Sequence, residues 1–125
     1  MKNLHIIATL LFGVALGAGM HQCQAESQKP VYLVVSSKLK AESEALEPYR
    51  RKARPLALAA GLEVLARGDV ELLEGDWDHH PSITIEKFNS MAEFKAFWHS
   101  PEYLEAKKLR QGLLDIEFIV AVEGS

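Results

Sequence analysis

The sequence predicts an α+β fold in which strands and helices follow one another in the order β-α-β-β-α-β. Three observations lead to this prediction. Short runs rich in β-branched residues, some of them alternating, are spread along the chain in the manner of strands. Apolar residues recur at spacings of three and four between residues 43 and 60, which is typical of one helix face. A Ser-x-x-Glu sequence at residues 90–93 is typical of the start of a second helix.

The first half of the domain supplies a strand and a helix. VYLVVSS (31–37) is β-branched, and its length and the polar residues that follow favour a buried strand. The helix is expected over residues 43–60, and Gly61 is suited to its C-terminal cap. Pro48 is tolerated in the first turn. Pro55 lies within the pattern and predicts a bend, because its ring removes a backbone donor and crowds the preceding turn.

Three further strands are expected, the first of them in two segments. LEVLA (62–66) and VELLEG (70–75) have strand composition, and residues 67–69 interrupt them with a glycine that permits a bulge or a tight turn. SITIEKF (82–88) alternates as a strand does, and DIEFIVAVE (115–123) closes the sheet. The residues expected on one face of this last strand are Ile116, Phe118, Val120 and Val122.

The second helix is expected from Ser90. In the capping-box arrangement the serine hydroxyl and the Glu93 side chain satisfy backbone donors at the helix start. In SPEY, Ser100 is suited to a second N-cap and Pro101 to a first helical position, so this sequence restarts or redirects the helix. The residues expected on its buried face are Met91, Phe94, Phe97 and Trp98.

These elements match the ferredoxin-like arrangement, a four-stranded antiparallel sheet with two helices on one face. The other face of the sheet is then uncovered in a single chain. Because a domain of about 100 residues buries only about two thirds of its unfolded surface, we expect the same face of a second subunit to cover it. The expected partner is therefore a second copy, in a homodimer.

The first 25 residues have the layout of a secretory signal peptide. Lys2 is followed by an apolar run of about 15 residues, shorter than the roughly 20 that a spanning helix needs, and by the small-residue ending CQA. We expect cleavage after Ala25, a short polar segment at 26–30, a single domain at 31–124, and a periplasmic or secreted protein with no membrane contact. An uncleaved membrane anchor is the alternative.

Composition limits the partners and the chemistry. Without Lys2 the chain carries 13 basic and 17 acidic residues, a net charge of −4, which disfavours nucleic acid because phosphate contacts need a positive face. After cleavage no cysteine remains, so neither a disulfide nor thiol chemistry is available. No nucleophile motif and no phosphate-binding glycine loop occurs, which disfavours acyl and phosphoryl transfer.

Several motifs occur along the chain: PVYLVV, the helix with Tyr49 and Pro55, Arg67-Gly68, LLEGDW (72–77), FNSMAEFKAFW (88–98), SPEYLEAKKLR (100–110) and FIVAVEG. Together they resemble a family of small proteins, the domain of unknown function 1330 family. The resemblance implies a ferredoxin-like protomer and a dimeric α+β barrel formed by two facing sheets, and it implies no activity. The chain differs from the family's usual pattern in its export signal and in His99 before SPEY.

The heptapeptide EGDWDHH (74–80) concentrates residue types that bind metal ions. Adjacent histidines in an extended chain point to opposite sides, so His79 and His80 cannot easily share one ion. A calcium loop would need further regular ligands and a turn glycine. We therefore expect a polar hairpin loop without a metal, with Trp77 folded back over an edge of the barrel. The candidate ligands in the metal interpretation are Asp76, Asp78, His79 and His80.

Other candidate site residues lie around the second helix and on the sheet. His99, at a helix junction, is suited to act as a base at neutral pH, and its alternative role is structural or exposed. Tyr103 and Arg110 lie seven residues apart on one helix face, where Arg67 and Glu86 from the sheet are candidates to join them. The alternative for each is a surface or dimer-interface ion pair.

Two functions from different classes follow. The first is an exported homodimer that binds a small molecule in a pocket lined by apolar side chains, with polar groups at its rim. The second is a cofactor-independent enzyme, by analogy with monooxygenases and isomerases of the same barrel type. In it His99 or Glu86 transfers a proton and Arg110 stabilises an anionic intermediate. Neither function needs a cofactor. The expected pocket residues are Phe97, Trp98, Tyr103, Phe118 and Val120, and the expected ligand contacts are Arg67, Trp77, Trp98, Tyr103 and Phe118.

Overall fold

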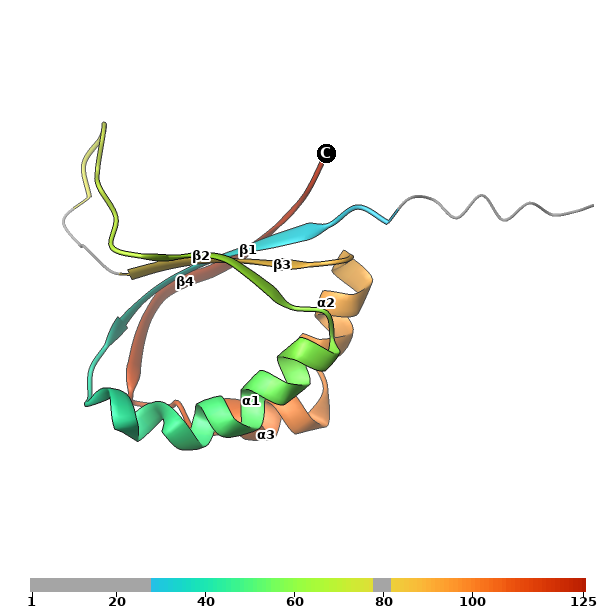
Figure 1. The fold of residues 1–125 in the computed structure, drawn as a ribbon. Helices are drawn as coiled ribbons and strands as arrows, with labels where there is room; N and C mark the ends of the chain where they lie inside the picture. Colours follow the sequence, from blue (N-terminus) through green and yellow to red (C-terminus); the bar gives the residue numbers. More distant parts are fainter. Residues whose placement is uncertain (1–27, 78–81) are drawn as a thin grey trace, which may run out of the picture.

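A computed structural model describes residues 28–77 and 82–125, which form a four-stranded antiparallel sheet with the helices gathered on one face (Figure 1). The α+β ferredoxin-like fold predicted from the sequence is confirmed, with the strand order β2-β3-β1-β4. The elements are β1 (Val31–Leu39), the 3-10 turn η1 (Ser43–Leu46), α1 (Glu47–Ala59), β2 (Glu63–Gly68), β3 (Ser82–Phe88), α2 (Met91–Trp98), α3 (Pro101–Lys108) and β4 (Leu114–Glu123).

The N-terminal signal peptide predicted at residues 1–25 lies outside the described residues. Within the part of the chain that is described, no helix combines the length and the apolar character needed to cross a membrane.

The prediction of a strand at VELLEG (70–75) is wrong. β2 ends at Gly68, and residues 69–77 form an irregular connection in which Leu73 is 87% exposed. The run has strand composition, but the strand that pairs with β2 begins only at Ser82. A segment forms a strand only where a neighbouring strand hydrogen-bonds to it, and the composition of the segment does not reveal whether such a neighbour is present.

The serine caps expected at the starts of α2 and α3 are confirmed. Ser90 Oγ accepts a hydrogen bond from the Glu93 N–H at 3.1 Å, which starts α2. Ser100 Oγ accepts from the Tyr103 N–H at 3.2 Å and donates to the Phe97 carbonyl oxygen at 2.8 Å. Ser100 therefore separates α2 from α3, as the SPEY sequence indicates. α1 continues through Pro55 to Ala59, and the bend at that proline stays a prediction.

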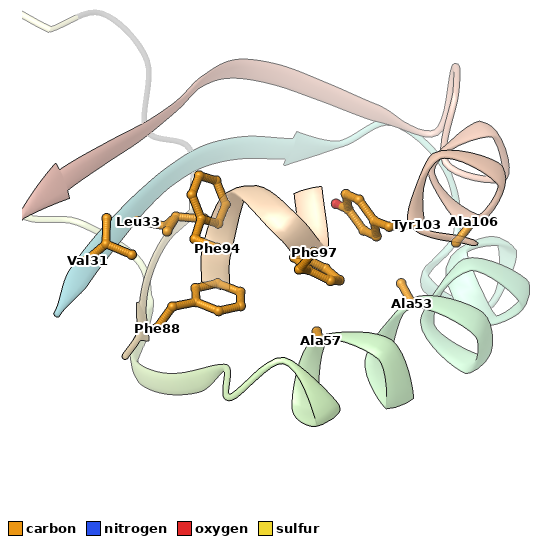
Figure 2. Close-up of a cluster of buried hydrophobic side chains, with 9 residues drawn as sticks. All are labelled: Val31, Leu33, Ala53, Ala57, Phe88, Phe94, Phe97, Tyr103 and Ala106. Carbon is orange, nitrogen blue, oxygen red and sulfur yellow. The ribbon is translucent and has the colours of Figure 1, made fainter. Parts of the chain in front are cut away.

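The hydrophobic core lies between the sheet and the helices, where aromatic rings from β3, α2 and α3 meet (Figure 2). The Phe88 ring lies 5.4 Å from Phe94 and 5.6 Å from Phe97, and Phe97 lies 4.3 Å from the Tyr103 ring, measured between centroids. Small residues on α1 and α3 let these helices approach closely. The buried residues of the core are Val31, Leu33, Ala53, Ala57, Phe88, Phe94, Phe97, Tyr103 and Ala106.

Strand register divides the sheet into a helix-side face and an uncovered outer face. Residues directly opposite each other share a face, so Glu86, which pairs with the core residue Leu33, lies on the helix side. A bulge in β4 places Phe118 opposite Ser36 but Ile116 opposite Ser37. The expectation that Ile116 shares a face with Phe118 is therefore wrong. Tyr32, Ser36 and Lys87 lie on the outer face together with its apolar residues, which are Val34, Ile83, Ile85, Phe118, Val120 and Val122.

Gly61 ends α1 and is predicted to resist substitution. Its φ is +89°, and the Gly61 and Leu62 N–H groups donate to the Leu58 and Ala57 carbonyls at 3.0 Å, which is a Schellman cap. We expect Gly61→Ala to lower the free energy of unfolding by about 1–2 kcal/mol, because an L-residue is strained there. Urea denaturation measures this loss. Gly68→Ala, in open space, is the control, and an equal loss in both variants would contradict the cap argument.

Candidate functional site

Glu86 is a partly buried carboxyl on the helix-side face of β3. Burial raises its pKa above the ordinary value of 4.5, because the charged form loses solvation, while the nearby Arg67 and Arg110 guanidinium groups oppose that rise. Among the described residues, no hydrogen bond or ion pair within 4.0 Å includes this carboxyl. Arg67 is held on the same face by a hydrogen bond from its Nε to Thr84 Oγ1 at 3.3 Å.

Two tyrosines, one on α1 and one on α3, bring their hydroxyl groups together beside Arg110. The hydroxyl oxygens of Tyr49 on α1 and Tyr103 on α3 lie 3.3 Å apart, and the Arg110 guanidinium carbon lies 5.5 Å from the centroid of the Tyr49 ring. Tyr103 is only 4% exposed. Burial, and next the neighbouring Tyr49, raise the pKa of Tyr103, so its hydroxyl stays protonated and remains a hydrogen-bond donor at neutral pH.

Lys107 and Trp98 extend the site. The Lys107 Nζ lies 4.3 Å from the Trp98 ring centroid and 5.9 Å from that of Tyr103. Burial, and then the charge of Arg110, lower the pKa of Lys107. Sequence reasoning missed Lys107, although it follows Tyr103 by four residues and so shares its side of α3. We call the group formed by Tyr49, Arg67, Glu86, Trp98, Tyr103, Lys107 and Arg110 the polar cluster.

The structure brings together some of the residues expected in the site and separates others. Arg67, Glu86, Trp98, Tyr103 and Arg110 are all part of the polar cluster. His99, by contrast, caps the end of α2 and is exposed.

Phe118 and Val120 point to the outer face, so they do not line one pocket with Trp98 and Tyr103 in a single chain. One extra residue in β4, Glu117, reverses the alternation that the sequence pattern assumed. The Trp77 indole N–H donates to Glu117 Oε1 at 3.2 Å, which joins the β2–β3 connection to β4 instead of to the polar cluster.

The described residues do not contain a group of three or more histidine, cysteine, aspartate or glutamate side chains able to hold a metal ion. Asp78, His79 and His80 of the EGDWDHH loop lie outside the described residues, so the expectation of a loop without metal stays a prediction.

The polar cluster has the parts needed for binding an anion and for proton transfer. A carboxyl with a raised pKa is suited to accept and release a proton. A protonated tyrosine hydroxyl and two arginines are suited to stabilise negative charge that develops on a bound oxygen.

Comparisons with known proteins agree with the fold. A family model described as a domain of unknown function (DUF1330) matches residues 30–125. Two crystal structures of RPA0582, a protein of unknown function from Rhodopseudomonas palustris, are 23% and 24% identical with TM-scores of 0.63 and 0.62; the matches cover 78% of this chain and 82% and 84% of those chains. SnoaB, a cofactor-independent oxygenase from Streptomyces nogalater, is 11% identical with a TM-score of 0.53, over 78% of this chain and 94% of SnoaB. No curated protein sequence matches. At these identities the structural likeness shows a shared fold alone.

The raised pKa of Glu86 predicts a pH dependence of stability. The folded state holds the Glu86 proton more tightly than the unfolded state, so this group's contribution to stability is largest below pH 4.5 and is lost as the pH rises through the folded pKa. Because Glu86→Gln cannot ionise, we expect its stability relative to the wild type to increase from about pH 4 to about pH 7. Urea denaturation at both pH values measures this, with the exposed Glu71→Gln as control. A constant difference would contradict the raised pKa.

Proposed function

We propose that this chain, which belongs to the domain of unknown function 1330 family over residues 30–125, is a homodimer that binds a small organic molecule between the sheet and helices of each protomer. The signal-like N-terminus supports the further proposal that this dimer is exported to the periplasm or secreted.

The observation that carries the binding proposal is the convergence of Glu86, Tyr103 and Arg110 from separate parts of the chain. The Glu86 carboxyl is partly buried and lies near two guanidinium groups without a direct ion pair among the described residues. Burying a carboxyl away from water is unfavourable unless something compensates for it. Ligand sites in proteins combine a few converging polar groups with aromatic side chains, and the Trp98 ring lies 5.4 Å from that of Tyr103.

The outer face of the sheet supports the homodimer. Most of its residues are apolar, apart from the ion pair of Lys87 and Glu63 toward the β2 edge. The helices lie on the opposite side (Figure 1), and Val122 at its surface is 55% exposed. Contiguous apolar surface of this kind is stabilised by removal from water, at about 25 cal/mol per Å². A second copy provides a matching apolar face, and two facing sheets are the arrangement that the family resemblance implies.

A second candidate function is a cofactor-independent enzyme that transfers a proton. The raised pKa of Glu86 favours it, because a carboxylate with such a pKa is a better base for a weakly acidic C–H or O–H group. Tyr103 and Arg110 would then hold the resulting anion. SnoaB, a cofactor-independent oxygenase, has this fold, although fold alone does not determine activity. Glu86→Gln separates the candidates: the enzyme loses turnover, whereas a binding protein changes only its affinity.

Binding near the polar cluster is testable with the two tryptophans of the chain, Trp77 and Trp98. We expect small organic molecules that bind to shift the Trp98 indole N–H signal in a ¹H–¹⁵N NMR spectrum and to leave that of Trp77 unchanged. Tyr103→Phe is expected to weaken binding by about fivefold through loss of one hydrogen bond. His99→Ala, the exposed control, should keep the wild-type affinity. Molecules that shift only Trp77, or an unchanged affinity in Tyr103→Phe, would contradict this location.

The dimer is testable with a matched pair of substitutions. Val122 on the outer face and Leu58 on α1 are 55% and 54% exposed. We expect Val122→Asp to raise the dissociation constant of the dimer by about a hundredfold or more, because a carboxylate would be buried without a partner. Leu58→Asp should remain dimeric. Native mass spectrometry and light scattering measure both, and a dimeric Val122→Asp variant would rule out this face as the interface.

A further inference from the structure

We infer that the bound molecule is a planar organic acid whose carboxylate is recognised by Lys107 and Arg110 and whose ring system is recognised by Trp98. This inference rests on the proposed binding function and specifies its ligand class. It assigns Lys107 as a specificity-determining residue.

The charges of the polar cluster favour an anion. The cluster contains three cationic side chains, Arg67, Lys107 and Arg110, and one carboxyl, Glu86. This excess of positive charge occurs in a chain whose overall net charge is −3. Arg110 lies close enough to Lys107 to destabilise its charged form. An anion placed between two like charges relieves their repulsion, whereas a cationic ligand would add to it.

The position of Lys107 connects charge recognition with ring recognition. Its ammonium group lies over the Trp98 ring, 4.3 Å from the centroid, and is also 5.9 Å from that of Tyr103. A charge-assisted hydrogen bond to a carboxylate is stronger than a cation–π contact that is partly exposed to water. An acid is therefore able to draw the ammonium group away from Trp98. The ring face that Lys107 leaves is then available to stack with a planar ligand.

Neighbouring residues explain why Lys107 and not Lys108 has this role. Lys108 Nζ lies 2.6 Å from Glu105 Oε1, and both side chains are exposed. That lysine already has an anionic partner, and it lies outside the polar cluster. Lys107 has aromatic rings and a like charge around it, so a bound carboxylate improves its environment.

The test titrates the purified protein with 1-naphthoate, its neutral analogue 1-naphthamide, and acetate, following the Trp98 indole signal. We expect the naphthoate dissociation constant to be lower than those of naphthamide and acetate by about tenfold or more. Lys107→Met should weaken naphthoate binding by about fivefold or more without weakening naphthamide binding. Lys107→Arg should retain most of the affinity. Lys108→Met is the matched control and should behave as the wild type.

Five outcomes would overturn the inference. Equal affinity for naphthoate and naphthamide would show that charge is not recognised, and equal affinity for acetate would show that the ring is not. Equal effects of Lys107→Met and Lys108→Met would remove the role of Lys107. If neither naphthalene compound binds while other small molecules shift the Trp98 signal, the acid class is wrong and the binding proposal stands. If no small molecule shifts that signal, both proposals fail.

Discussion

The packing of Tyr103 is the interaction on which the rest of the structure depends most. Its ring lies in the core, 4.3 Å from Phe97 between centroids, while its hydroxyl oxygen lies 3.3 Å from that of Tyr49. One side chain thus attaches α3 to the apolar core and directs a polar group toward α1. Because Lys107 follows Tyr103 by one helical turn, the same contact sets where its ammonium group lies.

The break between α2 and α3 makes this packing achievable. Ser100 closes α2 through the Phe97 carbonyl and opens α3 through the Tyr103 N–H, so the chain changes direction within two residues. Trp98 and Tyr103, on either side of the break, then lie with ring centroids 5.4 Å apart. In one continuous helix, residues five apart project in different directions, because neighbours on a helix face are three or four residues apart. The capping serine is therefore as important to the polar cluster as the side chains within it.

Features that depend on neighbouring residues were predictable from the sequence, and features that depend on strand pairing were less so. Ser90 and Ser100 act within one helical turn, so their patterns identify the helix starts. The grouping of Glu86 with Arg67 and Arg110 also follows from the predicted topology. The strand expected at residues 70–75 fails because no pattern within a segment specifies whether another strand will pair with it. Lys107 was missed because a lysine on a helix is usually exposed to solvent, and nothing in the sequence around it indicates that its ammonium group lies over the Trp98 ring.

The bulge at Glu117 shows how one residue allows the two faces of the sheet to have different compositions. The extra residue places Ile116 on the helix side and Phe118 on the outer side. Its carboxylate accepts hydrogen bonds from Ser36 Oγ at 2.7 Å and from the Trp77 indole at 3.2 Å, which stabilise the irregular backbone. Beyond the bulge, alternation is regular again, so Phe118, Val120 and Val122 together form an apolar row. The bulge therefore determines which residues of β4 face the helices and which form the apolar row of the outer face. A change that removed it would shift every β4 residue on one side of it to the opposite face.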